Sequence, residues 1–358
     1  MPVASLQKLI TAIDDEFLAL EFLDIGPRAK HNTRLILPAT FEAPNLRYLW
    51  LSHFASPIGS RLLATAVGLV RLVLRRIRPS IYLHPNQLLQ LLLLLPHLER
   101  LDIGFSSPVS NRDLKRQLLN TPIIAYTTLP NLHSFAFWGV SAYLEALLPH
   151  MTTPRLEKLD IHFFNQLTFS VPRLLQFMTT TENFRFGCAE FIFYHRAVSV
   201  IFSPVEATPI NFAVEVICGH LDWQVSSMAQ VFNILSPLSS TVVDLSLVYE
   251  DQTLSSEGHN QVDRTQWREL LGSFRNVKTL RVHNGLVGEV SRSLRLDGEP
   301  PLELLPELNE LMCPQGSHND KTFAAFIHER EVAGQPIKVI EEAFPAGASS
   351  ISSPLPLA

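Results

Sequence analysis

The side chains best suited to chemistry in this sequence are aromatic and charged residues that alternate with apolar residues. Tyr48 and Trp50 lie in one such segment, and Arg71 and Arg75 lie in the next. Alternate residues of a strand point to opposite faces, so these four side chains are expected on the face opposite the leucines. Aromatic residues and arginine are enriched at the energetic centres of protein interfaces. The chemistry that we expect is therefore recognition of a partner.

Further segments repeat this alternation, and together they predict a continuous partner-binding face. Its candidate residues are Tyr48, Trp50, Arg71, Arg75, Arg100, Asp102, Trp138, Lys158, Asp160, His162, Arg281 and His283. The same segments also place Phe22, Asp24, Ser134, Asp244, Ser246 and Thr279 on this face. The alternative is that Trp50 packs beneath a loop and the arginines are simply solvated. A register slip of one residue would exchange the two faces.

Sequence motifs of common catalytic and metal sites are not found. The sequence has no Gly-rich phosphate loop, no Gly-x-Ser-x-Gly, no Cys-x-x-Cys and no His-Glu-x-x-His. Cys188, Cys218 and Cys313 are far apart and lie in apolar runs, which is typical of buried thiols in a reducing compartment. We therefore predict no catalytic residues, no metal site and no cofactor, and the protein is not expected to be an enzyme.

The composition excludes several functional classes. Apolar residues make up 46% of the 358 residues, so a fully disordered chain is excluded. The net charge of -5 argues against a general nucleic-acid binder. One dense basic cluster, at Arg71, Arg75, Arg76 and Arg78, keeps nucleic acid as an alternative partner. A single cluster on an acidic chain is more typical of a contact with an acidic partner or of a solvated patch.

Leucine accounts for 57 residues, and a repeat explains this number. Segments of the form Leu-x-x-Leu-x-Leu include 45–51, 68–74, 97–103, 131–137, 155–161, 241–247, 276–282 and 307–313, with weaker copies at 19–25, 181–186 and 211–216. Their central apolar residues are Leu23, Leu49, Leu72, Leu101, Phe135, Leu159, Phe184, Val214, Leu245, Leu280 and Leu311, about 29 residues apart on average.

This period predicts an α/β leucine-rich-repeat solenoid. We expect a curved horseshoe of about 11 strand-helix repeats, with a parallel sheet on the concave side and helices on the convex side. The alternative is a set of unrelated buried strands in an ordinary α/β domain. Phenylalanine replaces leucine around 177–212, and the stretch 189–209 is predicted to be a hairpin or an irregular insertion.

The segments between the strands carry helix signals. Asp263 and Gln266 predict a capping box before an apolar stripe. A second stripe follows Asp222, which is predicted to cap that helix, and Pro85 and Pro96 are predicted to bound a third.

The ends of the array define the predicted domains. Residues 1–17 are predicted to form an N-terminal capping helix, and 18–341 the solenoid with its C-terminal cap. That cap comprises a helix at 319–331 and an edge strand at 337–340, and the Pro- and Ser-rich tail 342–358 is predicted to be disordered. No signal peptide or membrane span is indicated, so a cytoplasmic or nuclear location is expected, without membrane contact.

Some long segments resemble a known protein family in more than the spacing of their leucines. The stretch 140–186, then HLDWQVSSMAQVFNILSPL (220–238) and DRTQWRELLGSFRNVKTLRV (263–282), resembles fungal F-box/leucine-rich-repeat proteins. The resemblance covers most of residues 40–315. It implies the substrate-recognition part of an SCF ubiquitin ligase, in which an F-box docks on a Skp1-type adaptor and the repeats present a protein or peptide ligand.

One element of that family is not found in the sequence. An F-box of about 45 residues, opening with Leu-Pro-x-Glu, does not precede the first repeat. A Skp1-type adaptor is therefore expected as a partner only if an F-box is encoded upstream of Met1. Otherwise the chain is expected to be a repeat-only remnant without a ligase role.

Overall fold

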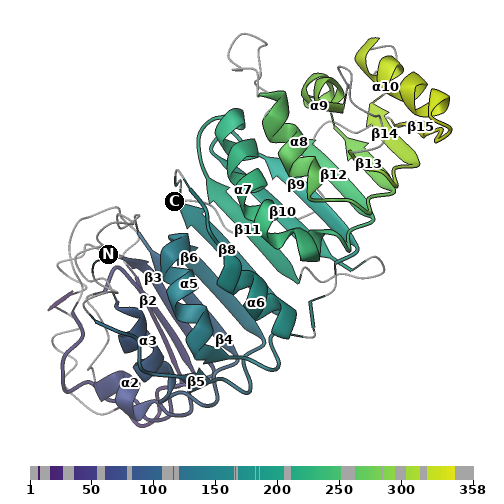
Figure 1. Cartoon of the computed structure of the whole chain (residues 1–358). Helices are drawn as coiled ribbons and strands as arrows, with labels where there is room; N and C mark the ends of the chain where they lie inside the picture. Colours follow the sequence, from purple (N-terminus) through teal and green to yellow (C-terminus); the bar gives the residue numbers. More distant parts are fainter. Residues whose placement is uncertain are drawn as a thin grey trace. The chain divides into compact units, whose positions relative to one another are not determined.

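The structure is a computed structural model in which the chain divides into two compact units (Figure 1). It describes residues 7–8, 17–26, 36–54, 61–78, 83–106, 116, 121–164, 166, 168–181, 183–184, 186–204, 211–250, 263–283, 285–294, 304–314 and 321–342. Unit 1 comprises Met1–Arg185 and Pro209–Ile217, and unit 2 comprises Phe186–Thr208 and Cys218–Ala358. Each unit is a mixed α/β structure. The predicted boundaries at 17 and 341 are not tested by this division.

Unit 1 contains a parallel sheet in which most strands follow one another in chain order. Its strands are β1 Phe22–Ile25, β2 Tyr48–Ser52, β3 Arg71–Ile77, β4 Arg100–Phe105, β6 Ser134–Gly139, β8 Lys158–Phe164 and β11 Phe212–Ile217. Each pairs in parallel with the next in that order. A separate small parallel pair joins β5 Thr127–Thr128 to β7 Met151–Thr152.

Unit 2 begins with an antiparallel hairpin and continues as a parallel sheet. The hairpin joins β9 Cys188–Phe193 to β10 Ala197–Ser203. β9 then pairs in parallel with β12 Asp244–Tyr249, which is followed by β13 Thr279–Val282, β14 Glu310–Pro314 and β15 Lys338–Glu342. The hairpin is one of the two outcomes predicted for 189–209.

Helices connect the strands and lie along one face of the sheet in each unit (Figure 1). Unit 1 has α2 Arg61–Thr65, α3 Pro85–Leu92, α5 Ser141–Leu147, the 3-10 turn η2 Leu148–His150, and α6 Pro172–Thr180. Unit 2 has α7 Leu221–Ser239, α8 Arg264–Gly272, α9 Val287–Leu294 and α10 Lys321–Val332. Within the described residues, none of these helices is both long and apolar enough to cross a membrane.

The helix starts confirm part of the predicted capping. The Asp263 side chain accepts a hydrogen bond from the Thr265 amide at 3.0 Å, as expected of an N-cap. The reciprocal half of the predicted capping box does not form, because the buried Gln266 Oε1 has no partner among the described residues. The prediction that Asp222 caps α7 was wrong: the N-cap is His220, and Asp222 lies in the first turn, where its charge favours the helix dipole.

Apolar strand residues that face the helices form the core of each unit. Leu49, Leu72, Leu101, Phe135 and Leu159 each have no exposed surface, and all of them occupy the same register position in neighbouring strands. In unit 2, aromatic side chains from strands and helices pack against one another in the core. They are Phe191, Phe193, Phe202, Phe232, Trp267 and Phe274. Stacking one strand-helix segment on the next therefore buries an apolar face that no single segment could bury.

Eight strands begin with the same backbone arrangement. A carbonyl just before or at the start of one strand accepts two successive amides at the start of the next strand, over 2.8–3.2 Å. The carbonyls belong to Glu21, Arg47, Val70, Glu99 and His133 in unit 1, and to Gly187, Val243 and Lys278 in unit 2. Because one acceptor holds two donors of the neighbour, this joint fixes where each strand starts relative to the strand before it.

Asparagine side chains add a second periodic contact between segments. Asn45, Asn131, Asn183 and Asn276 each donate an amide hydrogen bond to a carbonyl 27–36 residues earlier in the chain. The four acceptors are Leu18, Pro96, Leu156 and Ser240, at 2.7–3.4 Å. The same residue type therefore performs the same structural task at four places along the sequence.

The predicted strands match the structure with one exception. All the predicted central residues except Phe184 lie in a strand, and the predicted edge strand at 337–340 overlaps β15. Phe184 follows the Asn183 turn, but the strand beyond it is β9, and β11 supplies the strand that pairs with β8. The described residues form fifteen strands against about eleven predicted repeats: ten hold a predicted central residue, β15 is the predicted edge strand, and β9 and β10 form the hairpin in 189–209. Only β5 and β7 were not predicted. Most of the predicted helix 1–17, and the tail beyond residue 342, lie outside the described residues.

Candidate functional site

The strand face of unit 1 that points away from the core carries its polar and aromatic side chains in three rows. Row 1 contains Phe22, Tyr48, Arg71, Arg100, Ser134 and Lys158, which are register partners on successive strands. Row 2 contains Asp24, Trp50, Val73, Asp102, Ala136 and Asp160. Row 3 contains Ser52, Arg75, Gly104, Trp138, His162 and Glu215.

Arg75, Trp138 and His162 form a layered cluster in row 3. The Arg75 guanidinium lies 3.8 Å from the centre of a Trp138 ring, and the His162 imidazole stacks on the indole at 4.3 Å and 8°. β3 and β8 lie on opposite sides of β6, so the two cationic side chains approach Trp138 from opposite directions. Gly104 lies between Arg75 and Trp138 and has no side chain to separate them. Cation–π attraction therefore holds the Trp138 ring in place.

Arg75 also forms a two-pronged ion pair with Asp102 of row 2. Arg75 Nε lies 3.0 Å from both carboxylate oxygens, and Nη2 lies 2.6 Å from Oδ2. The Asp102 side chain is only 2% exposed. Burial raises the pKa of the Asp102 carboxyl, and the Arg75 guanidinium opposes that rise. The pair is rigid because its planar geometry leaves one arrangement for the arginine.

His162 is held between two carboxylates. Its Nε2 lies 3.1 Å from Asp160 Oδ1, and its Nδ1 lies 3.3 Å from Glu215 Oε1. Burial by itself would lower the pKa of His162, but the two carboxylates outweigh it and raise that pKa to about 9. The imidazole is therefore charged at neutral pH, with a carboxylate opposite each ring nitrogen. Such a ring fixes the local geometry and is unsuited to act as a general base near pH 7.

Row 1 combines an aromatic pair with unpaired positive charge. Phe22 and Tyr48 stack at 4.2 Å and 8°, and the Arg71 guanidinium lies 4.9 Å from the Tyr48 ring centre. Within the described ranges, Arg71, Arg100 and Lys158 form no ion pair, in contrast to Arg75. Burial and the neighbouring Arg71 charge lower the pKa of Arg100. Like charges therefore face each other along this row.

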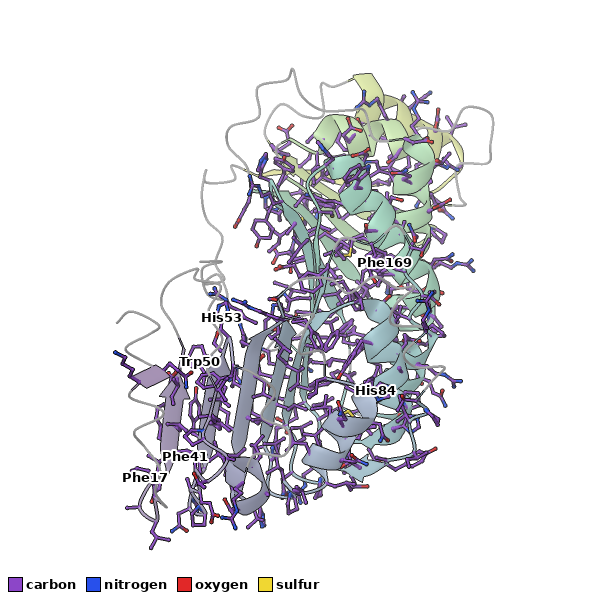
Figure 2. All side chains as sticks on the ribbon, turned by 90° about the vertical axis from the view of Figure 1, so that its left-hand side faces the viewer. Phe17, Phe41, Trp50, His53, His84 and Phe169 are labelled. Atoms are coloured by element: carbon purple, nitrogen blue, oxygen red, sulfur yellow. The ribbon has the colours of Figure 1, made fainter. Side chains whose placement is uncertain are left out.

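A strained corner lies where β2 and β3 end. His53 has a φ of 62° and Arg76 a φ of 57°, values that cost free energy for residues other than glycine. Arg76 Nη1 lies 3.2 Å from His53 Nε2, and burial followed by the nearby arginine charges lowers the pKa of His53. A bulge between Leu74 and Ile77 accompanies the Arg76 conformation. Figure 2 labels Trp50 and His53 close together at the strands, and His84 at the start of α3.

Ten of the twelve predicted binding residues lie on the outward face of the unit 1 strands. Arg281 and His283 belong to unit 2, where Arg281 Nε lies 3.1 Å from Met312 Sδ and His283 follows β13. The predicted basic cluster is divided: Arg71 and Arg75 lie in rows 1 and 3, whereas Arg76 contacts His53. Trp50 is half-buried, and its Nε1 has no hydrogen-bond partner among the described residues.

Sequence reasoning missed Glu215 as a site residue. The segment NFAVEV places Glu215 between the inward-facing Val214 and Val216, so the same alternation could have identified it. Glu190 was also missed; in unit 2, Arg281 lowers its pKa although burial raises it more. Glu215 lies in one of the weaker copies of the repeat, and Glu190 lies in the stretch 189–209, where no copy was assigned.

Searches for similar proteins add nothing to the identification. No model of a known protein family matches the chain, and a search of curated proteins returns no significant match. In the part of the chain that the structure describes, no group of three or more His, Cys, Asp and Glu side chains is arranged to hold a metal ion. What the geometry offers is a preorganised polar and aromatic surface.

Proposed function

We propose that the protein is a non-catalytic interaction scaffold that binds a protein or peptide partner on the three rows of unit 1. The observation that carries this proposal is the layered cluster of Arg75, Trp138 and His162. Its side chains are held by ion pairs and ring stacking before any partner arrives, so little conformational entropy would be lost on binding. Half-buried aromatic and arginine side chains of this kind are typical energetic centres of interfaces.

We also propose that the strand-helix segments are leucine-rich repeats. The repeated carbonyl joint and the four asparagine contacts support this proposal, because both recur with the spacing of the sequence repeat. Parallel strands with helices on one face are what such repeats would produce. The added hairpin β9–β10 would then be an insertion in the array.

The sequence resemblance supports a more specific role. In this proposal the chain is the substrate-recognition part of an F-box-like protein of an SCF ubiquitin ligase, and its ligand is a protein destined for ubiquitination. The test is a pull-down with a purified Skp1-type adaptor, using the product of a reading frame extended upstream of Met1. Absence of association with that extended product would contradict the ligase role and leave the scaffold role standing.

Photo-crosslinking tests the scaffold role directly. A benzophenone amino acid replaces Ser134, which lies between Arg100 and Lys158 in row 1, and in a matched protein it replaces Arg173, an exposed residue of α6 on the helix side. We expect a protein partner to be crosslinked from position 134 and not from 173, and to be lost when Trp138→Ala is added. Identical crosslinked proteins from both positions, or none from either, would contradict binding on this face.

A further inference from the structure

We propose that row 1 of unit 1 binds an extended acidic segment of the partner, and that an apolar residue at one end of this segment packs on Phe22 and Tyr48. This inference rests on the proposed scaffold function and adds the chemistry of the ligand. The row runs across six neighbouring strands in the order Phe22, Tyr48, Arg71, Arg100, Ser134, Lys158. With strands about 4.8 Å apart, it is about 24 Å long, the length of seven or eight extended residues.

The charge of the row determines the class of ligand. Arg71, Arg100 and Lys158 form no ion pair among the described residues, and Arg71 Nε is buried without a hydrogen-bond acceptor. The acids of row 2 form their ion pairs elsewhere, Asp102 with Arg75 and Asp160 with His162. The Asp102 charge partly opposes the lowering of the Arg100 pKa, and the Lys158 charge helps to lower the pKa of Asp160, but neither contact is an ion pair. Carboxylates or phosphates on a partner would satisfy these donors and relieve the repulsion between the two arginines.

The spacing of the charges favours separate acidic side chains. Arg71 and Arg100 lie on adjacent strands, whereas one strand carrying Ser134 separates Arg100 from Lys158. The charged side chains therefore start about 5 and 10 Å apart. Acidic residues at alternate positions of an extended peptide lie about 7 Å apart, and long arginine and lysine side chains can accommodate the difference. Three cations are a short footprint for a nucleic-acid backbone, which carries charge at closer intervals.

The aromatic end sets the direction of the segment. Phe22 is 58% exposed and stacks on Tyr48, so one face of this ring pair is open to an apolar side chain. The exposed Asp24 lies at the same end, two residues beyond Phe22 in β1. Its carboxylate would repel an acidic residue placed there. The apolar residue is therefore expected over Phe22 and Tyr48, and the acidic residues toward Lys158.

A binding assay with a designed peptide tests the inference. The probe is a fluorescein-labelled peptide of about eight residues, with phenylalanine near one end and Asp or Glu at alternate positions after it. Fluorescence anisotropy with the full chain is compared for this peptide, its Asn/Gln counterpart, and a single-stranded oligonucleotide of similar length. We expect binding of the acidic peptide that weakens as salt is raised, and markedly weaker binding of the two other probes.

Matched variants locate the binding to row 1. The double variant Arg71→Gln/Arg100→Gln is expected to weaken binding roughly 5- to 30-fold. The control Arg155→Gln/Arg173→Gln removes the same charge from exposed positions of unit 1 away from row 1, and it should change affinity by less than about twofold. Thermal melts establish that all variants are folded. Phe22→Ala is expected to weaken binding of the peptide that contains phenylalanine, and to leave unchanged the binding of a peptide with alanine in its place.

Several results would overturn the inference. These are equal binding of the acidic and neutral peptides, equal losses in the two double variants, or tighter row-1-dependent binding of the oligonucleotide. Crosslinking from position 134 to a partner that lacks an acidic segment would also overturn it, yet would leave the scaffold function intact. Failure of the crosslinking test alone, with the peptide result as expected, would instead count against the scaffold function.

Discussion

The outward faces of the two units share one architecture and differ in charge and packing. The first register row is basic in unit 1, whereas in unit 2 it contains Cys188, Asp244, Thr279, Glu310 and Lys338. In the Arg75–Asp102 pair of unit 1 the carboxylate is buried and the arginine stacks on Trp138, while in the Lys338–Glu310 pair of unit 2 the side chains are 68% and 35% exposed. The difference teaches that the strands set where side chains lie on the surface. Which surface can bind a partner then depends on the residue types at those positions.

The largest expected effect comes from breaking the buried pair of unit 1. Arg75→Ala leaves Asp102 charged and buried, and we expect it to destabilise the protein by about 3–5 kcal/mol. Urea denaturation measures this loss. The double variant Arg75→Met/Asp102→Leu should recover much of it, because it leaves no unpaired charge. If Arg75→Ala proves as mild as a surface substitution, the contrast between the two faces is wrong.

The next effect concerns the charge on His162. Its pKa in the folded protein is about 9, above the ordinary value near 6.5. The stabilisation from its charged form is therefore complete below about pH 6.5 and is lost as the pH rises through 9, a change of about 3 kcal/mol. Denaturation of the protein and of His162→Gln between pH 6 and 10 measures it. If the stability difference between the protein and His162→Gln stays constant across this range, the placement of His162 between two carboxylates is contradicted.

The smallest effect is expected at the exposed pair of unit 2. Glu310→Gln removes the partner of Lys338, which lies 3.0 Å away. Because Lys338 is exposed and Glu310 is partly exposed, the free energy of unfolding should fall by about 0–1 kcal/mol, and less at high salt. The same denaturation assay at low and high salt checks this. A loss as large as that of Arg75→Ala would show that exposure does not separate the two pairs.

Local patterns explain how much of the fold was predictable. Leu49 and Leu51 are buried and alternate with the less buried Tyr48, Trp50 and Ser52, so burying the leucines leaves only one orientation for this strand. The prediction of a strand at Phe184 was wrong. Asn183 makes the same contact with the preceding segment as the other three asparagines, at Leu156, but the strand that pairs with β8 comes from residues 212–217. Which distant segment pairs with a strand depends on long-range packing, and a local apolar pattern carries no information about it.

The candidate site was predictable in its composition and not in its contacts. Alternation placed Arg71 and Arg75 on one face, but it could not show that Asp102 neutralises Arg75 and leaves Arg71 unpaired. That distinction depends on side-chain conformations and on the bulge in β3 between Leu74 and Ile77. The pairing of His162 with Glu215 joins β8 to β11, so it requires the strand order that the sequence did not reveal.

The carbonyl joint at the start of the strands has a consequence for how this chain can vary. In unit 1 the accepting residues Glu21, Arg47, Val70, Glu99 and His133 are 23 to 34 residues apart, yet each makes the same two hydrogen bonds. Insertions and deletions on the helix side can thus accumulate without moving the rows. Such a chain can exchange one ligand for another through point changes at fixed positions while its connecting segments drift freely in length.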